Sequence, residues 1–126
     1  MKTMGREIFI SITEDFSRAP YGRKSAHDEY NGERFREEYL KPALDSYEKV
    51  TVDLRGTPGL GPSFLEEAFG GLVRHGYITK DDFCKRLEFP PGNERNQRKI
   101  MRHLERARFG SSKGAPLERQ YTSAIR

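Results

Sequence analysis

The strongest structural signal in the chain lies in residues 50–73, which read VTVDLRGTPGLGPSFLEEAFGGLV. Residues 50–54 are rich in β-branched side chains and predict a strand. A loop with three glycines and two prolines follows over residues 55–62. Ser63 then stands three residues before Glu66, which is the spacing of a capping box. We therefore expect a helix that begins with Ser63 as its N-cap.

The expected helix carries an apolar stripe of helical period and has a recognisable end. The stripe consists of Leu65, Ala68, Phe69, Leu72 and Val73. Gly76 fits the residue just past the helix end, and His75 suits the negative end of the helix dipole. The adjacent acids Glu66 and Glu67 are explained at this stage by the cap and by the positive end of the dipole, and not as a catalytic pair.

The segments on either side extend the pattern into an α/β chain. Residues 7–13 alternate, with three isoleucines on one side and Phe9 on the other, and predict a strand buried largely on both faces. The remaining expected elements are a helix over 31–41 ended by Pro42, a short helix over 79–85, a strand over 87–89 and a last helix over 94–108 capped by Asn93. Strands separated by helices favour a small, mostly parallel sheet with helices packed on it.

Length and composition set the outer limits. The chain has 126 residues, which suits one domain, expected over residues 1–109, with a flexible basic tail over 110–126. A single cysteine excludes an internal disulfide and a thiolate zinc site. We find neither a membrane span nor a signal peptide, so we expect a cytoplasmic protein.

The loop before Ser63 comes close to a phosphate-binding motif. Gly56, Gly61 and Ser63 have the P-loop spacing, but Pro62 stands where that motif needs lysine. A nucleotide binder or enzyme at residues 56–63 is therefore only the third alternative. The histidines His27, His75 and His103 share no motif, and Cys84 is expected to be a small buried thiol. We predict no catalytic residue, no metal site and no cofactor.

Charge is distributed unevenly along the chain. Residues 1–89 hold 14 basic and 16 acidic residues, whereas residues 90–126 hold 9 basic and 3 acidic ones. On the last helix, one sector collects five cations: Arg95, Arg98, Lys99, Arg102 and Arg106. The opposite side is apolar and holds Ile100, Met101, Leu104 and Ala107. Such a face predicts an anionic partner, and contact with a nucleic acid would be to its backbone.

Three stretches together resemble the STAS-like domain of unknown function, a bacterial and phage-associated family related to anti-sigma-factor antagonists. They are residues 14–17 with 22–23 (EDFS and GR), residues 31–37 with Leu40 and Pro42 (NGERFRE), and residues 50–54 with 63–73 (VTVDL and SFLEEAFGGLV). The resemblance covers roughly residues 7–108. It implies a sheet with helices packed on it and no catalysis by the domain itself.

The resemblance also implies a protein-binding switch. In STAS antagonists, a serine at the start of the helix after a central strand is phosphorylated by a partner kinase, which releases the partner. Ser63 occupies the matching position here, after a loop of eight residues that replaces the usual short Asp-Ser turn.

We therefore predict a non-enzymatic regulatory domain that binds an unidentified protein and is switched at Ser63. The predicted interface consists of Arg23, Asp28, Arg55, Thr57, Leu60, Ser63, Phe64 and Glu67. The alternative is a nucleic-acid- or nucleoprotein-binding factor, encoded by a phage or mobile element, that uses the five cations of the last helix. We make no prediction of the oligomeric state.

Overall fold

The structure is a computed structural model that describes residues 6–23 and 29–110. The predicted tail, apart from Gly110, and the predicted interface residue Asp28 lie outside the described residues. In chain order the elements are β1 (Glu7–Ser11), η1 (Ile12–Phe16), α1 (Gly32–Phe35), η2 (Arg36–Leu40), α2 (Lys41–Ser46), β2 (Lys49–Asp53), α3 (Pro62–Leu65), η3 (Glu66–Gly70), α4 (Gly71–Arg74), α5 (Lys80–Arg86), β3 (Leu87–Glu88) and α6 (Glu94–Arg106). The elements marked η are π-helical turns.

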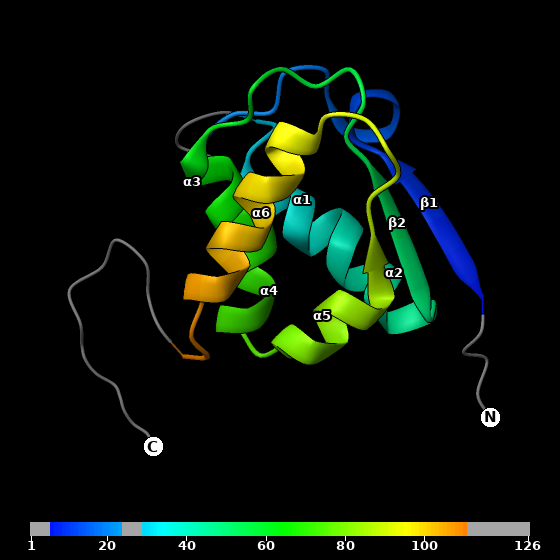
Figure 1. Ribbon diagram of the computed structural model, residues 1–126, viewed down its shortest axis with the longest axis vertical. Coiled ribbons are helices and arrows are strands. Elements are labelled where there is room, and N and C mark those ends of the chain that lie inside the picture. The colour runs from blue at the N-terminus through cyan, green and yellow to red at the C-terminus, as the bar shows by residue number, and fades with distance from the viewer. Residues whose placement is uncertain (1–5, 24–28, 111–126) are drawn as a thin grey trace.

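The three described strands form a parallel sheet in the order β1-β2-β3. Helices separate the strands in sequence and lie together to one side of the sheet, with β1 at its outer edge (Figure 1). This arrangement confirms the predicted α/β class with a small parallel sheet. Thr79 caps α5, because its side chain accepts the N–H of Asp82.

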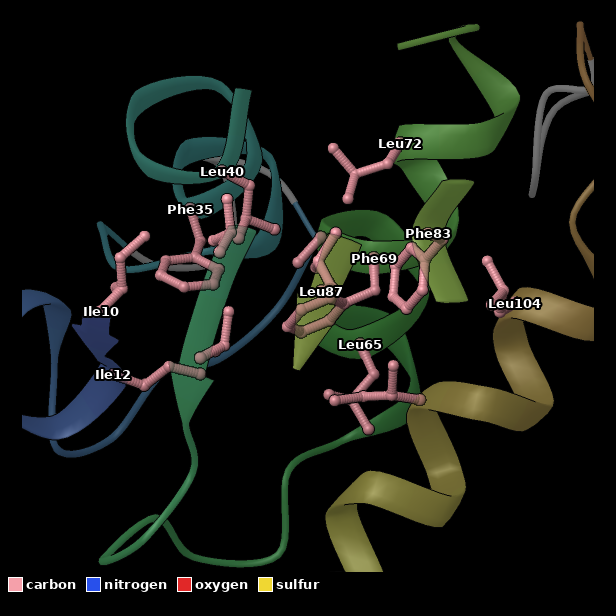
Figure 2. Packing of buried hydrophobic residues seen from close by; sticks show 14 of the residues in the cluster. Ile10, Ile12, Phe35, Leu40, Leu65, Phe69, Leu72, Phe83, Leu87 and Leu104 are labelled. Atoms are coloured by element: carbon pink, nitrogen blue, oxygen red, sulfur yellow. The ribbon is translucent and has the colours of Figure 1, made fainter. Parts of the chain in front are cut away.

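The core lies between the sheet and the helices. The predicted stripe of the 62–74 helix is buried throughout, with Leu65, Ala68, Phe69 and Leu72 at 0% exposure. Figure 2 shows Phe69 beside Phe83 from α5, and Phe35 and Leu40 from the helix over residues 32–46 belong to the same cluster. Burial of such large side chains is the main stabilising contribution in a domain of this size.

The first strand differs from its prediction in length and in burial. It ends at Ser11, whose side chain accepts the N–H of Glu14 and starts the π-turn η1. Phe9 is 55% exposed, so the strand is not buried on both faces. The reason is its position at the sheet edge, on a face that no helix covers.

The first long helix continues past Pro42 to Ser46, whereas the sequence predicted an end at Lys41. The turn before Pro42 is π-helical, and the N–H of Lys41 bonds to the carbonyl of Arg36, five residues back. This wider turn accommodates the proline ring that would clash in a regular α-helix.

Two smaller predictions were also wrong. Cys84 is exposed, because it lies on a different side of α5 from the buried Phe83. The last helix ends at Arg106 and not at Arg108.

None of the helices within residues 6–23 and 29–110 combines the length and hydrophobicity that crossing a lipid bilayer requires.

Candidate functional site

The loop between β2 and α3 is held in place by the start of α6. Asn96 is fully buried, donates from Nδ2 to the carbonyl of Pro58 (2.9 Å) and accepts the N–H of Leu60 on Oδ1 (3.1 Å). Asn93 donates to the carbonyls of Leu54 (3.2 Å) and Thr57 (3.0 Å). A glycine- and proline-rich segment is thus fixed by amides that lie 36 to 39 residues further along the chain.

Asn93 stands at the predicted cap position, but its side chain does not cap α6. It has a left-handed backbone (φ 60°) and turns its amide toward the loop. Asn is one of the few non-glycine residues that adopt this conformation readily. The capping residue expected from sequence is therefore a loop anchor.

Several predicted interface residues are internal. Leu60 and Phe64 are each 1% exposed, and Thr57 is buried with its hydroxyl donating to the carbonyl of Leu54 (2.6 Å). Glu67 is also buried, at 3% exposure. These four side chains offer no face to a partner in the folded domain. The exposed members of the predicted interface are Arg55 and Ser63.

Arg55 is largely occupied by its neighbour Asp53. Its guanidinium donates from Nε to Oδ1 (2.9 Å) and from Nη2 to Oδ2 (2.8 Å), which is a bidentate pair. These hydrogen bonds lower the pKa of Asp53 from its ordinary value. The Asp53 carboxylate is therefore ionised and paired, and the Arg55 side chain remains accessible from solvent at the end of β2.

Ser63 lies in the first turn of α3 and is not the cap of the helix. Gly61 is the N-cap, Pro62 is the first helical residue, and the N–H of Leu65 bonds to the carbonyl of Gly61. Proline favours this first position because its φ is already helical. The predicted capping box is therefore wrong, and the Ser63 side chain stands exposed without a capping bond.

A small hollow of about 240 Å³ opens beside Ser63. Its other walls are Tyr21, Gly22, Gly61, Pro62 and Phe64. Tyr21 is 65% exposed, and its segment is fixed because Tyr21 donates its N–H to the carbonyl of Tyr30 and Gly22 accepts the N–H of Gly32. The hollow thus combines an exposed aromatic ring and a serine hydroxyl on a well-anchored backbone.

The two long helices are joined by a cluster of charges that residue spacing did not reveal and that is buried at Arg36, Glu66, Glu67 and Arg74. The charge cluster consists of Arg23, Arg36, Glu37, Glu66, Glu67 and Arg74. Glu67 receives Arg36 Nη1 at 2.6 Å, and Glu66 receives Arg74 Nε at 2.7 Å. With three arginines and three glutamates, the cluster is formally neutral.

Within the charge cluster, hydrogen bonds and neighbouring charges together outweigh the effect of burial on the pKa of Glu67. Burial alone would raise the pKa of Glu67, but the hydrogen bond from Arg36 and the charges of Arg74 and Arg36 lower it overall. The predicted explanation of Glu66 and Glu67 by a helix cap was wrong, since both carboxylates bind arginines from other segments. One feature of the sequence could have indicated the ion pairs: this helix is apolar on most sides, so acidic residues on it are buried and need cationic partners.

Backbone N–H groups that a phosphate-binding loop would need to leave free are already used inside this loop. Thr57 donates its N–H to Leu54, and Leu60 donates its N–H to Asn96. Pro58 and Pro62 have no N–H.

Among the residues that the structure describes, no three histidine, cysteine or carboxylate side chains gather as a metal ion requires.

The cationic face of α6 lies on the solvent side, as its spacing predicted. Arg95, Arg98, Arg102 and Arg106 are exposed, whereas Lys99 is half-buried and donates to the carbonyl of Leu60 (3.2 Å). The opposite face buries Ile100, Leu104 and Ala107. Met101 was predicted on that face but is 36% exposed, at its margin.

A comparison with protein families gives one match. A family model described as a STAS-like domain of unknown function matches residues 31–93, half of the chain. The chain belongs to this family. Neither a curated protein nor a solved structure matches it.

The family match confirms the resemblance for residues 31–93, whereas the stretch over residues 14–23 and the rest of the predicted range 7–108 lie outside the matched region. The STAS-like region runs from the cap of α1 to the start of α6, so it includes β2, the loop, Ser63 and most of the charge cluster. Strand β1 and all of α6 lie outside the matched region of this STAS-like domain.

Proposed function

We propose that this STAS-like domain is a non-enzymatic regulatory module that binds another protein at the hollow beside Ser63. The observation that carries the proposal is an exposed serine hydroxyl next to an exposed tyrosine, both on backbone that is fixed from several directions. The proposal assigns no catalytic step to the domain.

The rigidity of the hollow favours binding. The loop is anchored through Asn93 and Asn96, and the Tyr21 segment is anchored to Tyr30. A preformed surface loses little conformational entropy when it binds, so more of the contact energy appears as affinity. Tyr21 offers a large, partly apolar side chain of the kind that commonly anchors protein interfaces.

Negative charge at Ser63 would oppose this binding for two reasons. In the free domain, a phosphate at the first turn of the 62–74 helix is stabilised by the positive end of the helix dipole and by water. In a complex, the same charge would be buried against Tyr21, Pro62 and Phe64, which offer it no cation. Both effects favour the unbound state, so modification of Ser63 would release the partner.

Affinity capture from the host with four versions of the domain tests the proposal. The wild type and Ser63→Ala should retain the same protein after nuclease treatment, whereas Ser63→Asp should lose it. Tyr21→Ala should weaken the same capture, because it removes the aromatic wall of the hollow. Equal retention of every captured protein by Ser63→Asp and the wild type would contradict the proposal.

The second candidate function is binding of a nucleic acid by α6. The observation that favours it is the contrast among the arginines of the described chain. Arg36, Arg74 and Arg55 form short ion pairs, whereas the four exposed arginines of α6 form no ion pair with any described residue. A row of unpaired guanidinium groups attracts a polyanion and releases its counterions.

A charge-reversal experiment separates this candidate from the first. Arg98→Glu with Arg102→Glu should abolish any salt-sensitive binding of DNA or RNA, while capture through Ser63 should persist. Arg18→Glu with Lys85→Glu changes the net charge equally at exposed positions elsewhere and should leave nucleic-acid binding intact. If both double variants bind equally well, α6 is not the nucleic-acid surface.

A further inference from the structure

The outer edge of β1 is an open strand edge. Arg6 directs its carbonyl toward β2, where it accepts the N–H groups of Glu48 and Lys49. Successive residues of a strand direct their backbone groups to opposite sides, so Glu7 and Phe9 direct theirs away from β2. Within residues 6–23 and 29–110, no hydrogen bond engages these outward groups. The edge is therefore a template for a further strand.

Apolar side chains line both faces of this edge. Phe9 is 55% exposed and lies in register with Thr51 and Glu88 on the sheet face that no helix covers. Parallel sheets are normally covered on both faces. On the helix side, Ile8 is only partly buried and borders a groove of about 610 Å³ that also contacts Tyr39.

The edge carries little of the protection that proteins give to strands exposed as monomers. The strand reads EIFIS over residues 7–11 and contains neither lysine nor proline. Only its last residue is blocked, because the N–H of Ser11 donates to Asp15 Oδ2 at 2.8 Å. A ladder is thus available over Glu7 and Phe9, and it ends at Ser11.

The charges at the two ends of the edge indicate which strand it accepts. Arg6 precedes the strand, with its guanidinium over the ring of Tyr47 in the groove wall. Asp15 lines the same groove and lies at the other end of the strand, where its carboxylate accepts the N–H of Ser11. An antiparallel copy of this edge brings Arg6, together with the adjacent Glu7, toward Asp15 of the other copy, whereas a parallel copy places Arg6 beside Arg6 and Asp15 beside Asp15.

We propose that β1 pairs antiparallel with β1 of a second copy of this chain, with the two-fold axis at Phe9. Each Phe9 then faces the Phe9 of the other copy, in a pair that exchanges both backbone hydrogen bonds. Ile8 lies opposite Ile10 of the other copy. The ladder stops before Ser11, whose N–H already donates to Asp15 and whose carbonyl, as the N-cap of η1, accepts the first hydrogen bond of that turn.

The dimer joins the two three-stranded sheets into one continuous sheet and covers Phe9. It leaves the hollow beside Ser63 accessible, because α3 lies on the opposite side of the molecule from β1 (Figure 1). Each dimer would then offer two sites to a partner that binds at Ser63. The proposal of a dimer does not depend on the function proposed for Ser63.

Sedimentation equilibrium over a concentration series tests the dimer. The wild type should show a mass that rises toward twice that of one chain. Phe9→Lys places two ammonium groups at the axis and should weaken dimerisation at least about tenfold. Phe109→Lys changes another exposed phenylalanine, 78% exposed and remote from the edge, and should leave the dimer intact. A wild type that stays monomeric throughout, or a Phe9→Lys variant that dimerises as tightly as the wild type, overturns the proposal.

Disulfide trapping tests the register. In a Cys84→Ser background, which removes the exposed native thiol, Phe9→Cys should form a disulfide-linked dimer under mild oxidation. Directly opposed residues of a hydrogen-bonded antiparallel pair have Cα atoms about 5.5 Å apart, within the range that a disulfide spans. Phe109→Cys in the same background should remain unlinked. Absence of the Phe9→Cys link in a dimeric protein would exclude pairing at this axis.

Discussion

Replacing Glu67 by glutamine removes one charge from the charge cluster while keeping the side chain's size. The Glu67 carboxylate is 3% exposed and receives Arg36 at 2.6 Å, Arg23 at 3.2 Å and Arg74 at 3.4 Å. Arg36 is 2% exposed, so the variant leaves a buried guanidinium with only part of its compensation. Breaking a buried ion pair in this way costs about 3–5 kcal/mol.

We therefore expect Glu67→Gln to lower the free energy of unfolding by about 3 kcal/mol or more in urea titrations. In a domain of this size, the melting temperature should fall by at least about 12 °C. Asp45→Asn is the matched control, because the Lys41–Asp45 pair is equally short (2.6 Å) but its aspartate is 59% exposed. The control should cost about 0.5 kcal/mol or less.

A double-mutant cycle identifies the cause of the loss. Arg36→Met removes the guanidinium that Glu67→Gln leaves uncompensated, so the double variant should be more stable than the sum of the two single losses predicts. If Glu67→Gln costs no more than Asp45→Asn, or if the two changes in the cycle are simply additive, the cluster is not a coupled and desolvated unit.

Three further predictions follow from the same contacts. Asn96→Leu leaves the N–H of Leu60 without its partner and should lower the free energy of unfolding by about 2–3 kcal/mol. Amide hydrogen exchange should become faster at Leu60 than at the core strand β2. Unchanged exchange at Leu60 would show that Asn96 does not anchor the loop. Ser63→Asp should leave the fold intact and raise the free energy of unfolding by up to about 1 kcal/mol, because its charge lies at the positive end of a helix. A clear loss of stability would show instead that Ser63 lies in a packed contact. Burial alone would raise the pKa values of Glu37 and Glu67, but hydrogen bonds and nearby arginine charges together lower both. Their stabilisation is therefore present above the unfolded-state value of about 4.3 and is lost as the pH falls through the lowered pKa values. The unfolding free energy of Glu67→Gln should fall less steeply in acid than that of the wild type.

The elements of the fold could be predicted because they depend on local patterns. The apolar period of the 62–74 helix predicted its buried face, and the β-branched run at residues 50–54 predicted the central strand. The exposure of Phe9 could not be predicted in the same way. Alternation identifies a strand, but only the order of strands in the sheet determines which face stays uncovered.

The candidate site was predicted only in part, because its geometry depends on contacts between distant segments. Ser63 and Glu66 have the spacing of a capping box, yet Pro62 starts the helix one residue earlier and Glu66 binds Arg23 and Arg74. The anchoring of the loop by Asn96 has no local signature either. Residue spacing placed Ser63 near the start of the helix, but it could not show that Gly61 is the cap or which of the surrounding residues are buried.

The central claim is that the hollow beside Ser63 binds a protein and that negative charge at this residue prevents the binding. The most direct measurement is the dissociation constant of the captured partner, purified, for the wild type, Ser63→Ala and Ser63→Asp by isothermal titration calorimetry. We predict that Ser63→Ala binds as the wild type does and that Ser63→Asp binds at least about tenfold more weakly. Equal dissociation constants for all three proteins would contradict the claim.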